Sequence, residues 1–142
     1  MKTIRLTIAG FGAVGQGVAG AIISKKNYLN RHGLDLRVVG IADSKGCEID
    51  QNGIDLESAV LRKKQEGTVA RVNGTAVDMI REVEHDIFVD VTPTNIEDGE
   101  PGLGNMFTAF RSGRHVITSN KGPLALHFTE LKEASEDHGL LF

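Results

Sequence analysis

Short apolar runs along this chain alternate with longer stretches in which apolar residues recur at helical spacing. Apolar runs of about four to eight residues favour strands, and apolar residues three and four positions apart favour amphipathic helices. The pattern predicts strands at residues 3–9, 35–42, 86–91 and 114–118. It predicts helices at residues 14–29, 56–65, 76–83, 102–112 and 128–137.

Strands that alternate with helices are typical of βαβ units, which build a mainly parallel sheet with right-handed crossovers. The expected fold is therefore α/β, a doubly wound, Rossmann-type domain. At 142 residues the chain is long enough for one such domain. Residues 47–74 give a weaker pattern outside their predicted helix. Residues 139–142 resemble the start of another strand, so we expect residues 1–142 to be the front portion of a longer protein.

Composition narrows the function mainly by exclusion. A net charge of −3 and a pI of about 5.9 give no general attraction to nucleic acids or anionic membranes. The N-terminus shows no secretory signal, and we expect a cytoplasmic protein. The single cysteine, Cys47, excludes an internal disulfide and a multi-cysteine metal site. None of the histidines shows metal-ligand spacing, so no metal is expected: His32, His85, His115, His127 and His138.

A glycine fingerprint, Gly-Phe-Gly-Ala-Val-Gly at residues 10–15, lies between the first predicted strand and the first predicted helix. In dinucleotide-binding folds, the first glycine permits a tight turn, the second lets the backbone approach a pyrophosphate, and the third allows close helix packing. The helix N-terminus then presents free N–H groups to the phosphates. We therefore predict that this loop binds a dinucleotide, through Gly10, Gly12, Ala13, Val14 and Gly15.

Asp43 ends the second predicted strand, where an acidic side chain can accept hydrogen bonds from the adenosine ribose. It lies 28 residues beyond Gly15 rather than the usual ~20, and a long first helix would explain the difference. Lys45 follows two residues later and could pair with the 2′-phosphate of NADP. Both residues are therefore predicted to bind the cofactor, and the choice between NAD and NADP stays open. A simple turn with a solvated Lys45 is the alternative. Residues 62–64, Arg-Lys-Lys, are expected on a solvated helix face, with an approach to a cofactor phosphate as the alternative.

Thr92 and Pro93 follow the strand predicted at residues 86–91. They would lie at the carboxyl edge of the sheet, beside the nicotinamide half of the cleft. Proline holds the backbone rigidly and lacks an N–H donor, so it could form a wall for a flat ring. Both residues are predicted to contact the cofactor. The next two residues, Thr94 and Asn95, could equally form an ordinary turn and helix cap.

The strand predicted at residues 114–118 ends abruptly in Ser119-Asn120-Lys121, and Gly-Pro then breaks the strand. Open α/β sheets bind ligands at the carboxyl ends of their strands. Lys121 is therefore the candidate catalytic residue, placed to stabilise charge on a substrate or to transfer a proton. Ser119 and Asn120 are candidate cofactor contacts. The alternative for Lys121 is a surface lysine in a loop.

Together these segments resemble the N-terminal cofactor domain of homoserine dehydrogenases. The resemblance is carried by residues 10–15, 90–94, 100–102 and 115–126. The glycine fingerprint is shared by many dehydrogenases, whereas the last segment, His-Val-Ile-Thr-Ser-Asn-Lys-Gly-Pro-Leu-Ala-Leu, is specific.

The resemblance implies an oxidoreductase that interconverts L-homoserine and L-aspartate 4-semialdehyde with NAD or NADP, on the route to threonine and methionine. It implies that Lys121 lies beside nicotinamide and substrate. Family members continue into a substrate-binding and dimerisation region that residues 1–142 do not include. We therefore expect this chain to bind cofactor without turning over homoserine unaided, and the intact enzyme to be a homodimer.

Two other functions remain open from the residues. One is a non-catalytic, dinucleotide-sensing Rossmann module, which the chain length fits. The other is the front domain of a different semialdehyde dehydrogenase, or of a reductase of the dihydrodipicolinate type. An acylating aldehyde dehydrogenase would need a nucleophilic cysteine, and Cys47, on the adenosine side, is poorly placed for that role.

Overall fold

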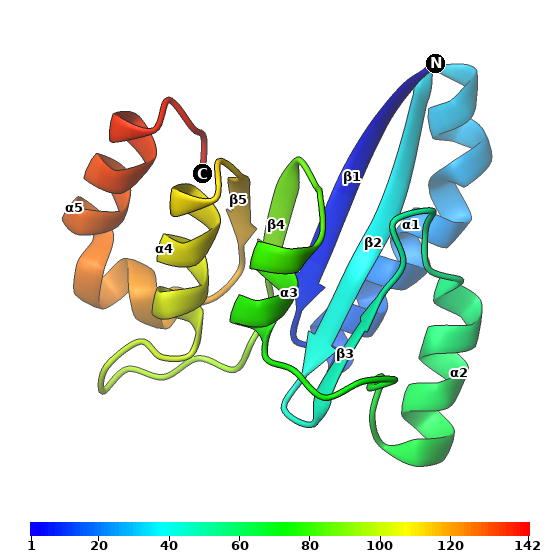
Figure 1. Cartoon of the computed structure of the whole chain (residues 1–142), viewed down its shortest axis with the longest axis horizontal. Helices are drawn as coiled ribbons and strands as arrows, with labels where there is room; N and C mark the ends of the chain where they lie inside the picture. The colour runs from blue at the N-terminus through cyan, green and yellow to red at the C-terminus, as the bar shows by residue number, and fades with distance from the viewer.

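The computed structural model covers residues 1–142 and shows strands alternating with helices along the chain (Figure 1). The elements follow in this order: β1 (Lys2–Ala9), α1 (Ala13–Arg31), β2 (Leu34–Asp43), β3 (Gly46–Ile49), α2 (Leu56–Glu66), α3 (Ala76–Glu82), β4 (Ile87–Asp90), α4 (Gly102–Arg111), β5 (His115–Thr118) and α5 (Lys121–Asp137). No helix combines the length and the apolar character that crossing a membrane would require.

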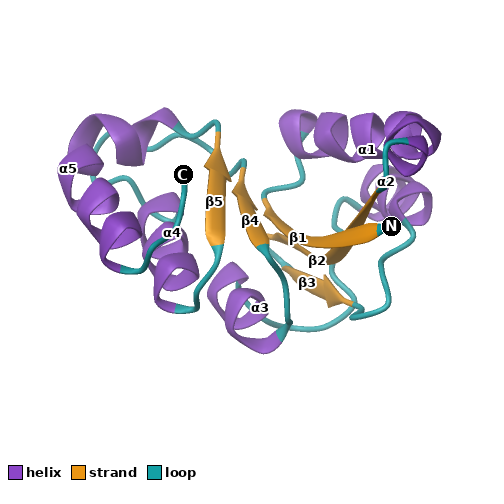
Figure 2. Ribbon diagram, turned by 90° about the horizontal axis from the view of Figure 1, so that it is seen from above, coloured by secondary structure: helices purple, strands orange, loops and turns teal.

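The five strands form one sheet in the order β3-β2-β1-β4-β5. β1 pairs in parallel with β2 on one side and with β4 on the other, and β5 adds in parallel to β4. Figure 2 shows α1 and α2 on one face of the sheet and α3 on the opposite face, while α4 and α5 gather at the β5 end. The structure thus confirms the predicted doubly wound, mainly parallel α/β fold.

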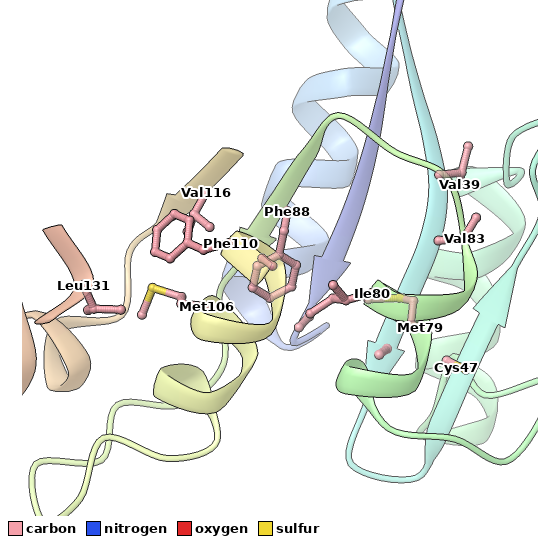
Figure 3. Packing of buried hydrophobic residues seen from close by; sticks show 13 residues of the cluster. Val39, Cys47, Met79, Ile80, Val83, Phe88, Met106, Phe110, Val116 and Leu131 are labelled. Carbon is pink, nitrogen blue, oxygen red and sulfur yellow. The ribbon is translucent and has the colours of Figure 1, made fainter. Parts of the chain in front are cut away.

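Two hydrophobic clusters fill the spaces between the sheet and its two helical layers. Side chains of α3, α4 and α5 pack on one face around Phe88 of β4 and Phe110 of α4, as Figure 3 shows. On the other face, Ile8 of β1 and Ile41 of β2 pack with Ala19 of α1. Successive strand residues point to opposite faces, so each central strand contributes to both clusters.

The edge strand β3 is the first difference from the predicted elements. Its four residues pair antiparallel to β2 immediately after a tight turn, and the sequence pattern predicted no strand there. A four-residue segment that contains a glycine and a glutamate carries almost no periodic signal. Pairing with the neighbouring strand decides its conformation instead.

Helix α5 is the second difference, because it begins at Lys121 rather than near residue 128. Asn120 caps this helix, and Pro123 falls in the first turn, where proline is tolerated because the missing N–H has no helical partner. A non-helical residue, His127, kinks the helix, so the pattern that predicted residues 128–137 reports only the part beyond the kink.

The predicted strand start at residues 139–142 is wrong, since these residues form no strand. They run beside β5 and make one backbone hydrogen bond to it, from the Val116 N–H to the Leu141 carbonyl at 3.0 Å. The Phe142 ring lies 5.6 Å from that of Phe110, measured between centroids. These contacts, and a hydrogen bond from the Leu141 N–H to His115 Nδ1 at 3.1 Å, hold the segment without a strand ladder.

Candidate functional site

A cleft of about 900 Å³ opens along the carboxyl ends of β1, β2 and β4. This edge is where doubly wound sheets bind ligands, and the strand order reverses here between β1 and β4. Eight of the predicted site residues line the cleft: Gly10, Gly12, Ala13, Val14, Asp43, Thr92, Pro93 and Ser119. The other four, Gly15, Lys45, Asn120 and Lys121, lie outside its lining.

A second cavity, of about 710 Å³, lies between α1, β2 and the start of α2. It contains none of the predicted site residues. The glycine loop and the polar strand ends meet only in the first cleft.

The glycine loop has the shape that its sequence requires. Gly10 has a φ of +93°, and a β-carbon there would overlap the backbone carbonyl of Val91 in the loop after β4. A β-carbon on Gly15 would overlap the Gly10 carbonyl, so α1 can pack against the turn only with glycine there. Gly12 differs from both, because a β-carbon there would meet no atom within 4 Å. Its backbone faces open space that a ligand can approach.

Helix α1 begins at this open loop. Gly12 is its N-cap, no side chain caps the first turn, and the first turn holds no acidic residue. The N–H groups of this turn therefore have no side-chain acceptor, and the helix dipole adds a partial positive charge. A pyrophosphate fits this arrangement, since it supplies both acceptors and negative charge.

Asp43 lies in the cleft wall, but protein donors already surround its carboxylate. The backbone N–H groups of Val69 and Lys45 donate to it at 2.9 Å each, and Lys63 Nζ and Thr68 Oγ1 donate at 3.0 Å each. Burial alone would raise the pKa of Asp43, but these hydrogen bonds outweigh it and lower the pKa to about 2. Asp43 is thus a fixed anion that ties β2 to α2 and the segment after it.

The basic residues near Asp43 are arranged differently from the expectation. Lys63 lines the cleft and pairs with Asp43, whereas Lys45 is exposed and outside the lining. Arg62, expected on a solvated face, is buried and forms an ion pair with Glu48 of β3. Lys63 is therefore the cation in the cleft wall beside Asp43, the position that the sequence pattern predicted for Lys45.

Asp90, at the end of β4, is completely buried beneath the other half of the cleft. Its carboxylate accepts hydrogen bonds from Thr92 Oγ1 at 2.7 Å, the Thr92 N–H at 3.2 Å, Asn120 Nδ2 at 3.2 Å and Thr118 Oγ1 at 3.5 Å. Burial raises the pKa of Asp90, and these hydrogen bonds offset part of that rise. The four donors come from the loop after β4, from the last residue of β5 and from the loop after β5, so Asp90 joins these segments.

Asn120 connects this cluster to α5. Its Nδ2 donates to Asp90 and also to Thr92 Oγ1, at 3.1 Å, while its Oδ1 accepts from the Gly122 N–H at 3.2 Å. The amide is 1% exposed, so Asn120 acts on the cleft through Thr92 rather than by lining it. Lys121 follows as the exposed first residue of α5, next to Ser119 at the cleft.

Asp90, Lys63 and Gly102 were not among the predicted site residues. Gly102 begins α4, and a β-carbon there would overlap the Asn120 amide and crowd the Asp90 carboxylate. An acidic residue inside an apolar strand run was the available signal for Asp90, because a buried charge needs compensating partners. The neighbouring sequence gives no signal for the contacts of Lys63 or Gly102, because their partners are distant along the chain.

The parallel sheet, the glycine loop at the helix N-terminus and the cleft at the strand ends define a dinucleotide-binding domain of the Rossmann class. The sequence profile described as "Homoserine dehydrogenase, NAD binding domain" matches residues 10–142. The chain belongs to this family.

Named relatives agree with this assignment. The chain is 39% identical to a homoserine dehydrogenase of Methanocaldococcus jannaschii, over 96% of this chain and 42% of that protein. It is 33% identical to an NAD(+)-dependent homoserine dehydrogenase of Pseudomonas canavaninivorans, over 100% of this chain and 42% of that protein. A hyperthermophilic archaeal homoserine dehydrogenase solved in complex with NADPH superimposes with a TM-score of 0.82 at 28% identity, covering 99% of this chain and 43% of that one. The chain thus spans about two fifths of the length of these relatives.

The Asp43 network predicts a specific acid dependence of stability. Because folding lowers the pKa of Asp43 from 3.8 to about 2, the network stabilises the fold fully above the unfolded value and loses its effect as the pH falls from 3.8 towards 2. The difference in free energy of unfolding between wild type and Asp43→Asn should therefore shrink between about pH 5 and pH 2. Urea denaturation across this range measures it. The exposed Asp137→Asn is the control and should give a small difference at every pH, whereas a constant Asp43→Asn difference would contradict the network.

The position of Lys63 predicts how the chain discriminates between cofactors. Lys63→Ala should weaken NADPH binding by about tenfold or more, because we expect the 2′-phosphate beside Asp43, where Lys63 is the cation that could pair with it. NADH binding should change less than about threefold, since NADH lacks that phosphate. Fluorescence titration of reduced cofactor measures both affinities, and Lys45→Ala is the matched control. A larger loss of NADPH affinity in Lys45→Ala than in Lys63→Ala would instead favour Lys45 as the residue that pairs with the 2′-phosphate.

Proposed function

We propose that residues 1–142 form the cofactor half of an NAD(P)-dependent homoserine dehydrogenase, which interconverts L-homoserine and L-aspartate 4-semialdehyde. The observation that carries this proposal is the combination of the family match with Ser119-Asn120-Lys121, which follow β5 at the same sheet edge as the glycine loop. This enzyme would act on the biosynthetic route to threonine and methionine. Because the chain spans about two fifths of its relatives, the activity belongs to the longer protein.

The cofactor would be held in two halves. The glycine loop and the first turn of α1 would bind the pyrophosphate, with Gly12 giving the closest backbone approach. The adenosine would lie towards the end of β2, and the nicotinamide nucleotide towards Thr92, Pro93 and Ser119. Bound NAD(P) supplies or accepts the hydride, and the chain supplies orientation and electrostatics.

Lys121 would act on the substrate oxygen. It is the first residue of α5, so its ammonium extends from a helix N-terminus that already favours negative charge. Asn120, anchored on Asp90, holds that terminus in place. This arrangement supports a role in binding the carbonyl or alkoxide oxygen and in moving a proton to or from it.

The other expectations about the intact protein stay predictions. Residues 1–142 should bind cofactor without turning over homoserine, because relatives are more than twice as long. By family resemblance we expect the intact protein to be a homodimer, and by its sequence we expect it to be cytoplasmic.

Replacing Lys121 tests the proposed function. In the enzyme that includes the region carried by the longer relatives, Lys121→Ala should lower kcat by about 100-fold or more, the usual effect of losing a proton-transfer group. The affinity of the chain for NADH or NADPH should change by less than about threefold, because the lysine acts on the substrate. Homoserine-dependent formation of reduced cofactor measures turnover, and fluorescence titration measures binding.

Lys132→Ala is the matched control. This lysine also lies on α5, where it makes only a surface ion pair with Glu136 at 3.9 Å. Such pairs contribute little to stability, so both turnover and cofactor affinity should stay near wild type. Near-normal kcat in Lys121→Ala would exclude the assigned role of Lys121, whereas no homoserine turnover by the wild-type longer protein would favour a non-catalytic, dinucleotide-sensing module.

A further inference from the structure

The Asp90 carboxylate is buried without a cationic partner. It is 0% exposed, and it forms none of the ion pairs in the structure. Its donors, from Thr92, Thr118 and Asn120, are all neutral. Asp43 differs, because Lys63 pairs with it directly. A buried charge held only by neutral dipoles keeps a strong field in its surroundings, since neither water nor a counterion cancels it.

Asp90 lies one hydrogen bond below the cleft. Thr92, whose hydroxyl donates to it at 2.7 Å, is itself part of the cleft lining. With the pyrophosphate at Gly12 and the adenosine towards Asp43, the space above β4 and β5 is left for the nicotinamide nucleotide. The carboxylate therefore lies beneath the half of the cofactor whose charge changes during hydride transfer.

Other charges near this half of the cleft act more weakly. Lys121 is exposed, so water and salt screen its ammonium. The N-termini of α4 and α5 lie against the carboxylate at Gly102 and the Asn120 cap, so their partial positive charges keep Asp90 ionised and offset part of its field. Glu100, at the cleft rim, is also exposed. The carboxylate of Asp90 is thus the buried charged side chain beneath this half of the cleft.

We propose that Asp90 sets the relative affinity for oxidised and reduced cofactor, by placing a buried negative charge beneath the nicotinamide ring. This inference rests on the proposed function, because it needs a nicotinamide in the cleft. Removal of a hydride leaves the ring with one positive charge and leaves the phosphates unchanged. Asp90 therefore attracts the oxidised form and not the reduced one. Tighter binding of the oxidised form favours hydride donation, which is the direction that reduces an aldehyde to an alcohol.

Asp90→Asn tests the proposal through a ratio of dissociation constants. NADH affinity of the 142-residue chain is measured by fluorescence titration, and NAD+ affinity by isothermal titration calorimetry, with NADPH and NADP+ used if these bind more tightly. Loss of the charge should raise the ratio Kd(oxidised)/Kd(reduced) by about tenfold, the scale for one charge acting at short range in a partly buried site. Circular dichroism shows whether the variant is folded. If Asp90→Asn does not fold, the ratio Kd(oxidised)/Kd(reduced) is measured on Asp90→Ser, which also removes the charge and should raise the ratio in the same way.

Two controls separate charge from structure. Thr118→Val removes the hydrogen bonds of the Thr118 hydroxyl with the Asp90 carboxylate, the Asp90 carbonyl and the Asn120 N–H but leaves the charge, so any loss should affect both cofactor forms equally. Glu97→Gln removes an exposed charge from the loop after β4, where solvent screens it. Both controls should keep the ratio within about twofold of wild type.

The outcomes distinguish this proposal from the proposed function. A ratio that rises in Asp90→Asn or Asp90→Ser and stays constant in both controls supports a role of the charge. Equal weakening of both cofactor forms, with the ratio unchanged, would leave Asp90 a structural residue only and overturn the inference while dinucleotide binding stands. A wild-type chain that binds neither form would overturn both.

Discussion

The parallel pairing of β1 with β4 is the constraint on which the site depends. It places the turn after β1 directly against the loop after β4, and Gly10 allows this contact because a side chain there would overlap the Val91 carbonyl. The strand order reverses at this pair, so the helices that follow leave a cleft open between them. The glycine loop and the Thr92-Pro93 wall belong to one site only because these two strands are neighbours.

Two carboxylates flank this cleft, and the protein treats them in opposite ways. Asp43 meets a lysine and backbone N–H groups, which hold its pKa at about 2 and make it a structural anion. Asp90 meets only neutral donors, so burial raises its pKa and its charge has no cationic side-chain partner. The first ties the end of β2 to α2 through Lys63, and the second ties the end of β4 to α5 through Asn120. The shape of the cleft therefore depends on carboxylates whose partners come from distant parts of the chain.

Local signals in the sequence were sufficient for most of the fold. The glycine fingerprint and the apolar strand runs are contiguous, so their periodicity predicted the α/β order and the edge that forms the cleft. The edge strand β3 and the start of α5 were missed because pairing with β2 and the Asn120 cap determine them. Lys45 was preferred over Lys63 because it lies closer to Asp43 in sequence, whereas the fold brings Lys63, 20 residues away, to the carboxylate. Contacts that cross between elements cannot be read from spacing alone.

The central claim is that the loop at residues 10–15 holds a dinucleotide, and titration of the chain with NADH and with NADPH tests it most directly. The same titration on Gly12→Val, which places a side chain in the open space of the cleft, and on Gly20→Ala, on an exposed turn of α1, identifies the binding position. We predict saturable binding of at least one cofactor by wild type and Gly20→Ala, weakened about tenfold or more in Gly12→Val by steric exclusion from the phosphate site. Equal binding by Gly12→Val and wild type, or no binding by wild type, would contradict the account.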